Sequence, residues 1–246
     1  MHHDSHSLLA RKFPVVTAVL LVGCLVSFVF ELCLGSRLAE FLLRFGVVPV
    51  GLVSYFNRVP GATFPSSVLP FFSSLILHGG FLHLLLNVSY LWVVGDFVED
   101  WLGRTRFVAL VLFGAATELV VRIGLSPSPS GLASVGMSGA VASLIGAFLI
   151  VLVRLRRSHE ADSHVSFLAY VPVLLALLAW FPAQLLNRRL AIARTAQTYE
   201  PVSWLALAAA LVLGMFLLSL TGRRIAATPA VAPAFPKEEA APVLGA

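Results

Sequence analysis

Six stretches of the chain are apolar over a length that can cross a bilayer, and more polar segments separate them. A transmembrane helix needs about 20 predominantly apolar residues. The pattern therefore predicts six membrane-spanning helices, at residues 13–34, 70–95, 105–125, 137–155, 165–187 and 201–221. The long segment between the first two, residues 35–69, is itself partly apolar, which is typical of a loop lying in the membrane interface.

This pattern predicts an all-α, polytopic membrane protein in which residues 13–221 form one bundle of six transmembrane helices. The first apolar run is too long for the core of a cleaved signal and is interpreted as a retained helix. Residues 1–12 are predicted to be a cytoplasmic N-terminal segment. Residues 222–246 are rich in alanine and proline and are predicted to be a disordered cytoplasmic tail.

Composition supports a membrane protein. Hydrophobic residues make up 59% of the chain and charged residues 12%, whereas soluble domains carry roughly 45–50% and about 25%. The formal net charge of +5 is interpreted as a topology signal, so the lipid bilayer is an expected partner and nucleic acid is not. Cys24 and Cys33 are about 13 Å apart on one helix and cannot pair. We expect no metal or other cofactor.

The distribution of lysine and arginine predicts the orientation of the chain. Six helices put both termini on one side of the membrane, and that side carries ten of these residues against six on the other. Because cytoplasmic loops carry the excess of positive charge, both termini are predicted to be cytoplasmic, in a bacterial-type plasma membrane.

Polar side chains converge at one depth. The second predicted helix carries His78, His83 and Asn87 in its early turns, and the fourth begins near Ser138. His83 and Asn87 are four positions apart and share a helix face. Both helices start at the outer side, so topology places the four polar residues in the outer leaflet. Polar residues inside a membrane are costly and often functional.

The residue types suit acyl chemistry. A serine at a helix N-terminus, between Gly136 and Gly139, exposes its hydroxyl where backbone N–H groups point outward. Histidine and asparagine side chains supply further donors to an oxyanion. Taken alone, the Gly-x-Ser-Gly segment is more often a close-packing motif, and each histidine alone is more often a satisfied interfacial residue. Their joint occurrence at one depth favours a site.

The order and spacing of these motifs resemble the rhomboid family of intramembrane serine proteases. The matching segments are His78-Gly-Gly-Phe-Leu-His83-Leu-Leu-Leu-Asn87, Gly95-Asp-Phe-Val-Glu99, Gly136-Met-Ser138-Gly139 and Trp180-Phe-Pro-Ala-Gln184. The resemblance implies a six-helix bundle with a site open to the outer leaflet. It implies that Ser138 is the nucleophile, that His83, Asn87 and the Ser138 backbone form the oxyanion hole, and that His78 is a rim residue.

The sixth predicted helix departs from the family pattern. That pattern has a histidine, the general base, at the position of Leu207, and this sequence contains no histidine after His164. Active members commonly place a tyrosine at the position of Ala142. A serine hydroxyl is a weak nucleophile at neutral pH without an adjacent base. Whether the chain is an enzyme is therefore open at this point.

Three hypotheses follow. In the first, the chain is a pseudoprotease that binds transmembrane segments of other membrane proteins without cutting them. In the second, it is an active serine endopeptidase that uses a different base, with His83 as the best internal candidate. In the third, it is a small transporter or channel, which would be supported by broken helices in paired halves. The sequence has no such pairing.

Overall fold

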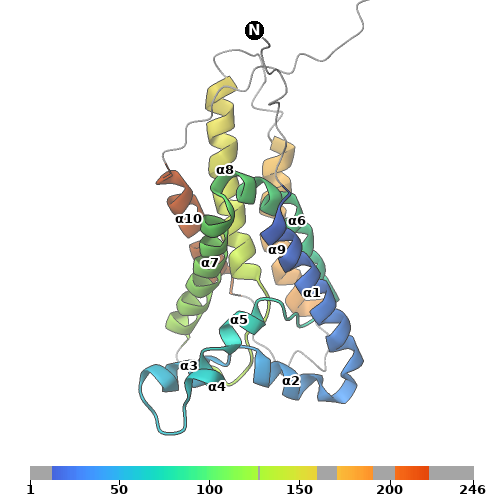
Figure 1. Cartoon of the computed structure of the whole chain (residues 1–246), viewed down its shortest axis with the longest axis vertical. Coiled ribbons are helices and arrows are strands. Elements are labelled where there is room, and N and C mark those ends of the chain that lie inside the picture. Colours follow the sequence, from blue (N-terminus) through green and yellow to red (C-terminus); the bar gives the residue numbers. More distant parts are fainter. Residues whose placement is uncertain (1–12, 127, 160–170, 191–202, 222–246) are drawn as a thin grey trace, which may run out of the picture.

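The computed structural model describes residues 13–126, 128–159, 171–190 and 203–221. Within these ranges the regular structure is helical, apart from one isolated bridge between Val47 and Ser134. The predicted segments 1–12 and 222–246 lie outside the described residues. The bundle in Figure 1 is made of α1 (Val15–Cys33), α6 (Phe81–Leu102), α7 (Arg104–Leu125), α8 (Ser138–His159), α9 (Val171–Leu190) and α10 (Trp204–Ser219).

Three helices in the described part of the chain, α1, α6 and α7, are both long and apolar enough to cross a membrane. Shorter apolar stretches occupy the other three predicted positions, at Ser138–Arg154, Leu174–Gln184 and Trp204–Ser219. The prediction of an all-α membrane protein is confirmed at this level. The length and hydropathy criteria support three of the six predicted spans.

The segment before α6 corrects the prediction of a continuous helix over residues 70–95. A short helix, α5 (Pro70–Ser74), is followed by a loop, and α6 begins only at Phe81 and continues to Leu102. Hydropathy alone does not detect this break, because Leu75, Ile76 and Leu77 keep the loop apolar on average, whereas the adjacent glycines Gly79 and Gly80 disfavour helix. His78 therefore lies in the loop before α6 and not in its early turns.

The expected long loop at residues 35–69 is largely helical. It contains the 3₁₀ helix Gly35–Arg37, α2 (Leu38–Phe45), α3 (Pro49–Phe56) and α4 (Phe64–Ser67). These short helices lie with α5 across one end of the bundle (Figure 1). The end at which they lie is also the end where α7 leads into α8.

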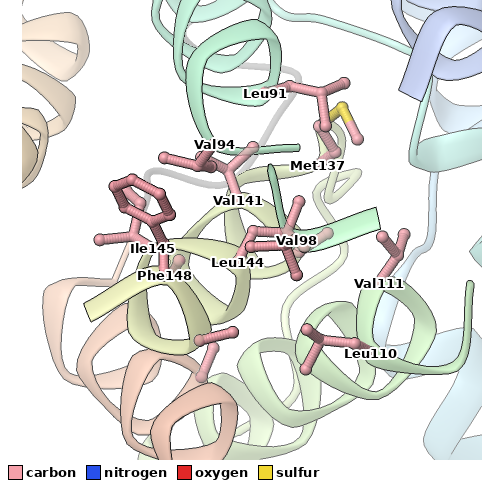
Figure 2. Packing of buried hydrophobic residues seen from close by; sticks show 14 of the residues in the cluster. Leu91, Val94, Val98, Leu110, Val111, Met137, Val141, Leu144, Ile145 and Phe148 are labelled. Carbon is pink, nitrogen blue, oxygen red and sulfur yellow. The ribbon is translucent and has the colours of Figure 1, made fainter. Parts of the chain in front are cut away.

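The core is built around α8. Its residues from Ala140 to Phe148 are almost all buried. Figure 2 shows side chains from α6 and α7 packed against one face of this helix, among them Leu91, Val94 and Val98 from α6 and Leu110 and Val111 from α7. Helix α8 is therefore the central helix of the bundle, and its buried first residue, Ser138, lies toward the end covered by the short helices.

The contact between α8 and α10 is made by backbone against backbone. A Cβ atom at Gly214 would lie 1.9 Å from the carbonyl oxygen of Ser143, and one at Gly146 would lie 2.0 Å from that of Leu211. Neither distance is possible for a real side chain, so both glycines are required for this approach. Small residues that allow such closeness are typical of helix contacts in membranes.

Glu99, near the end of α6, anchors the start of α1. Its carboxylate accepts hydrogen bonds from the backbone N–H groups of Val16 (3.0 Å) and Thr17 (2.8 Å) and from the Thr17 hydroxyl (2.8 Å). The N-cap residue of α1 is Pro14, which supplies no side-chain acceptor. Glu99 thus satisfies N–H groups that a helix N-terminus leaves unpaired.

Candidate functional site

Ser138 is the first residue of α8 and is buried. The loop before it is held by the layer of short helices. Val47 and Ser134 exchange two backbone hydrogen bonds, of 3.0 and 2.6 Å, and the Gly136 N–H donates to the Ser74 carbonyl at 2.8 Å. Gly136 has φ +99°, a left-handed conformation that glycine adopts without strain. This turn sets the direction in which α8 starts.

The His83 ring lies directly against this turn. A Cβ atom at Gly136 would be 2.4 Å from His83 Cε1 and 2.7 Å from Nε2, so only glycine fits there. The imidazole is 1% exposed. Neither of its ring nitrogens has a hydrogen-bond partner among the described residues. The structure therefore places His83, a buried polar group, against Gly136, which is two positions before Ser138 in the chain.

The first turn of α8 carries backbone donors that have no acceptor within the helix. The first N–H of the helix with a backbone acceptor is that of Val141, which donates to Met137 at 2.9 Å. The amides of Ser138, Gly139 and Ala140 precede it, where a helix has no intrahelical acceptors to offer. The N-terminus of a helix favours negative charge or a carbonyl oxygen through these amides.

Asn87 lies one helical turn after His83 on α6 and is fully buried. Gln184 of α9, also fully buried, donates from Nε2 to Asn87 Oδ1 at 3.1 Å. The Asn87 Nδ2 group has no partner among the described residues. Sequence reasoning gave Gln184 no role, although an uncharged polar residue inside an apolar stretch was the signal that could have found it.

His78 lies next to His83 although it is not on the same helix. The two ring centroids are 5.2 Å apart at an interplanar angle of 67°. The His78 backbone N–H donates to Glu31 Oε1 at 3.0 Å, and its Nδ1 lies 3.1 Å from the Ile76 carbonyl oxygen.

Glu31 is a second residue that sequence reasoning missed. It is 2% exposed on α1, and its Oε2 atom has no partner among the described residues. A single carboxylate in the first apolar stretch was the available signal. The linked polar residues of this region, which include His78 and Asn87, thus come from α1, the α5–α6 loop, α6 and α9. Within the described residues, no group of three histidine, cysteine or acidic side chains is arranged to hold a metal ion.

Leu207 is buried in the first turns of α10, after the N-cap Ser203. Arg154, late in α8, donates to the carbonyl oxygens of Leu218 and Ser219 at the end of α10, so the two helices run in the same direction. The Ser143–Gly214 contact lies five residues after Ser138 and seven after Leu207, and the Gly146–Leu211 contact lies eight after Ser138 and four after Leu207. The levels of Ser138 and Leu207 along the bundle thus agree to within four residues, about 6 Å.

The surroundings of Leu207 are apolar. Leu207, Ala142 and Ala210 belong to the same buried hydrophobic cluster. Neither Leu207 nor Ala142 carries a group that accepts a proton. At the level of Ser138, α10 therefore presents a hydrocarbon side chain to the core.

Comparison with known proteins identifies the family. The model of the rhomboid domain matches residues 65–224, about two thirds of the chain. This chain belongs to the rhomboid family. The match includes His78, His83, Asn87, Ser138 and Leu207, whereas Glu31 lies outside it.

Two curated relatives carry rhomboid names. The chain is 30% identical over 133 residues to the rhomboid protease GluP of Bacillus subtilis, and 42% identical over 82 residues to RHOMBOID-like protein 5 of Arabidopsis thaliana. These matches cover 54% and 33% of this chain but only 24% and 26% of the two relatives. The matched part thus spans about a quarter of the length of either relative.

Proposed function

We propose that this rhomboid is a pseudoprotease, which binds transmembrane segments of other membrane proteins at the site around Ser138 without cutting them. The observation that carries the proposal is Leu207, a buried leucine at the level of Ser138 where the family pattern has its base. Without a base the serine hydroxyl is a poor nucleophile, and loss of a triad member leaves only a small residual rate.

The donors that would hold a client remain in place. In this proposal Ser138 occupies the nucleophile position, and the backbone of Ser138 with His83 and Asn87 forms the oxyanion hole. His78 lies at the rim. The buried donors on His83 and Asn87 are unpaired within the described residues, and unpaired buried donors cost about 1–3 kcal/mol each. A backbone carbonyl of a bound transmembrane segment would satisfy them.

The proposal includes six membrane spans over residues 13–221, flanked by cytoplasmic segments at 1–12 and 222–246, in a bacterial-type plasma membrane. Helices α8 and α9 have 22 and 20 residues, about 30 Å at 1.5 Å per residue, which matches a bilayer core. The apolar stretches within α8, α9 and α10 are shorter, at 17, 11 and 16 residues. The close contact of α8 and α10 through Gly146 and Gly214 favours two neighbouring spans.

A cleavage assay in proteoliposomes tests the proposal. The purified chain is reconstituted with a single-span substrate of an active rhomboid, beside that active rhomboid. We expect the substrate to crosslink to a photoreactive residue placed at Phe81, an exposed position two residues before His83, and to remain intact. Cleavage that Ser138→Ala abolishes would overturn the proposal.

The placement of His83 favours a second candidate function. Its ring lies against Gly136, two residues before Ser138, and both ring nitrogens are without a partner in the described part of the chain. In this alternative His83 serves as the base of an active intramembrane serine endopeptidase. The geometry weakens this candidate in one respect, because His83 would then no longer be an oxyanion donor.

A fluorophosphonate probe distinguishes the two candidates. The alternative requires labelling of Ser138 that His83→Ala removes, while His78→Ala leaves labelling intact. The pseudoprotease proposal requires labelling of Ser138 no stronger than that of an ordinary serine such as Ser89, in membranes where an active rhomboid is labelled.

A further inference from the structure

A groove lies between α7 and α10 at the opposite end of the bundle from Ser138. Its volume is about 200 Å³, and Leu102, Arg106, Ala109, Phe113, Leu217 and Thr221 line it. The two helices are neighbours in the bundle (Figure 1). The lining is almost entirely hydrocarbon, apart from Arg106 and Thr221 where α7 begins and α10 ends. The groove is therefore apolar along its length and basic at one end.

Arg106 is free to bind a ligand. It is exposed, and no hydrogen-bond or ion-pair partner for its guanidinium exists among the described residues. No acidic side chain in the described part of the chain lines the groove. An unpaired guanidinium at the end of an apolar groove is complementary to a phosphate attached to a hydrocarbon chain.

A second guanidinium lies behind the groove wall. Arg154 of α8 donates to the Thr221 hydroxyl at 3.2 Å and to the Leu218 carbonyl oxygen at 3.0 Å. It holds the end of α10 that forms one side of the groove, and it adds positive charge there. Basic pockets between transmembrane helices on the cytoplasmic side are suited to anionic lipid head groups.

The length of the groove fits part of an acyl chain. Arg106 and Phe113 are seven residues apart on α7, about 10 Å along the helix at 1.5 Å per residue. One leaflet of the hydrocarbon core is about 15 Å deep. If the phosphate of a lipid contacts Arg106, one of its acyl chains would therefore lie in the groove through roughly two thirds of the depth of the leaflet.

We propose that this groove is a binding site for an anionic phospholipid, with its phosphate on Arg106 and one acyl chain between α7 and α10. This site is independent of the function of Ser138. The lipid would fill the space that α7 and α10 leave between them and would stabilise their contact.

Native mass spectrometry of the full chain in detergent tests the proposal. Phosphatidylglycerol and phosphatidylcholine with the same acyl chains are titrated separately. We expect phosphatidylglycerol to bind at least fivefold more tightly, and Arg106→Gln to remove this preference, because one arginine near a phosphate contributes about 1 kcal/mol, which is about fivefold in affinity.

Two further variants separate the groove from general surface charge. Arg104→Gln removes the same charge two residues away, outside the groove, and should change the preference by less than twofold. Ala109→Phe should fill the groove and weaken both lipids while Arg106 remains. Variants are compared only if their melting curves show one cooperative transition. Equal effects of Arg104→Gln and Arg106→Gln, unchanged binding by the folded Ala109→Phe protein, or equal affinity for the two lipids would overturn the site.

Discussion

The α8–α10 and α6–α9 contacts hold helices together in opposite ways. Between α8 and α10, backbone meets backbone at Gly146 and Gly214. Between α6 and α9, side chains reach across. Gln184 donates to Asn87 at 3.1 Å, and the Tyr90 hydroxyl donates to the Ala176 carbonyl oxygen at 2.5 Å.

The difference matters because lipid supplies little hydrophobic force between helices, which must associate through close packing or hydrogen bonds. The α8–α10 contact relies on close packing at Gly146 and Gly214, with hydrogen bonds from Arg154 at the end of α10, and it is apolar around Leu207. The α6–α9 contact keeps polar groups at the level of the site. The position at which we propose that the base is missing therefore falls on the side that relies on packing, and the donors of the proposed oxyanion hole fall on the side that relies on hydrogen bonds.

The largest expected effect comes from returning a polar pair to the α8–α10 side. Leu207→His with Ala142→Tyr supplies an imidazole and a ring to stack on it, at the level of Ser138. Because a complete set of catalytic groups exceeds the residual rate by several orders of magnitude, we expect cleavage of a transmembrane substrate at least ~10³-fold faster than by the parent chain.

The matched control adds Ser138→Ala to the same two changes, and cleavage should return to background. A double variant that is folded, as judged by cooperative melting in detergent, but does not cleave would mean that the site lacks more than its base. The comparison between the two contacts would then not account for the inactivity that we propose.

The next effect tests how tightly α8 and α10 are packed. Gly214→Ala places a Cβ where the Ser143 carbonyl oxygen lies, so the helices must separate. Overpacking of this kind costs about 3 kcal/mol, which lowers the melting temperature of a protein of this size by roughly 10 °C. Gly124→Ala on α7 is the control, because a Cβ there meets nothing within 4 Å.

Thermal unfolding of the three proteins in the same detergent measures this effect. Equal melting temperatures for Gly214→Ala and Gly124→Ala would contradict the close approach of the two backbones.

The smallest effect concerns the α6–α9 hydrogen bond. Gln184→Leu leaves the buried Asn87 Oδ1 atom without its donor, which costs about 1–3 kcal/mol. Replacing both partners, as Asn87→Leu with Gln184→Leu, should restore much of this loss, because two apolar groups need no hydrogen bond.

Unfolding free energies of the parent, both single variants and the double variant form a double-mutant cycle. We expect a coupling energy of about 1 kcal/mol. Additive effects would mean that Asn87 and Gln184 contribute independently to the free energy of unfolding. The α6–α9 contact would then resemble the α8–α10 contact, which relies on close packing.

Hydropathy predicted the positions of the helices well where a long apolar run coincides with one helix, as for α1 and α7. The hydropathy prediction was wrong at residues 70–95. Hydropathy averaged over a long window of sequence does not detect that two adjacent glycines interrupt the helix. His78 was therefore assigned to a helix, although it reaches His83 from a loop. The motif around Ser138 indicated a helix start, and the helix begins at that residue.

The partners of the site residues were harder to predict. Glu31 is 47 positions from the residue to which it bonds, and Gln184 is 97 positions from Asn87. Each is visible in the sequence as a polar residue in an apolar stretch, but spacing does not say which polar group it meets. A pattern of period 3.6 shows which residues share a helix face, but it does not show which other helix that face contacts.

The sequence by itself determined the membrane character of the chain, the order of its polar motifs and the absence of a histidine from the last helix, because these depend on residue type and local spacing. Only the tertiary structure decided that His83 lies against Gly136, that Leu207 is at the level of Ser138, and that Gln184 holds Asn87. Such contacts depend on how whole helices approach one another, and residues such as Gly146 and Gly214 allow that approach only when their backbones face each other.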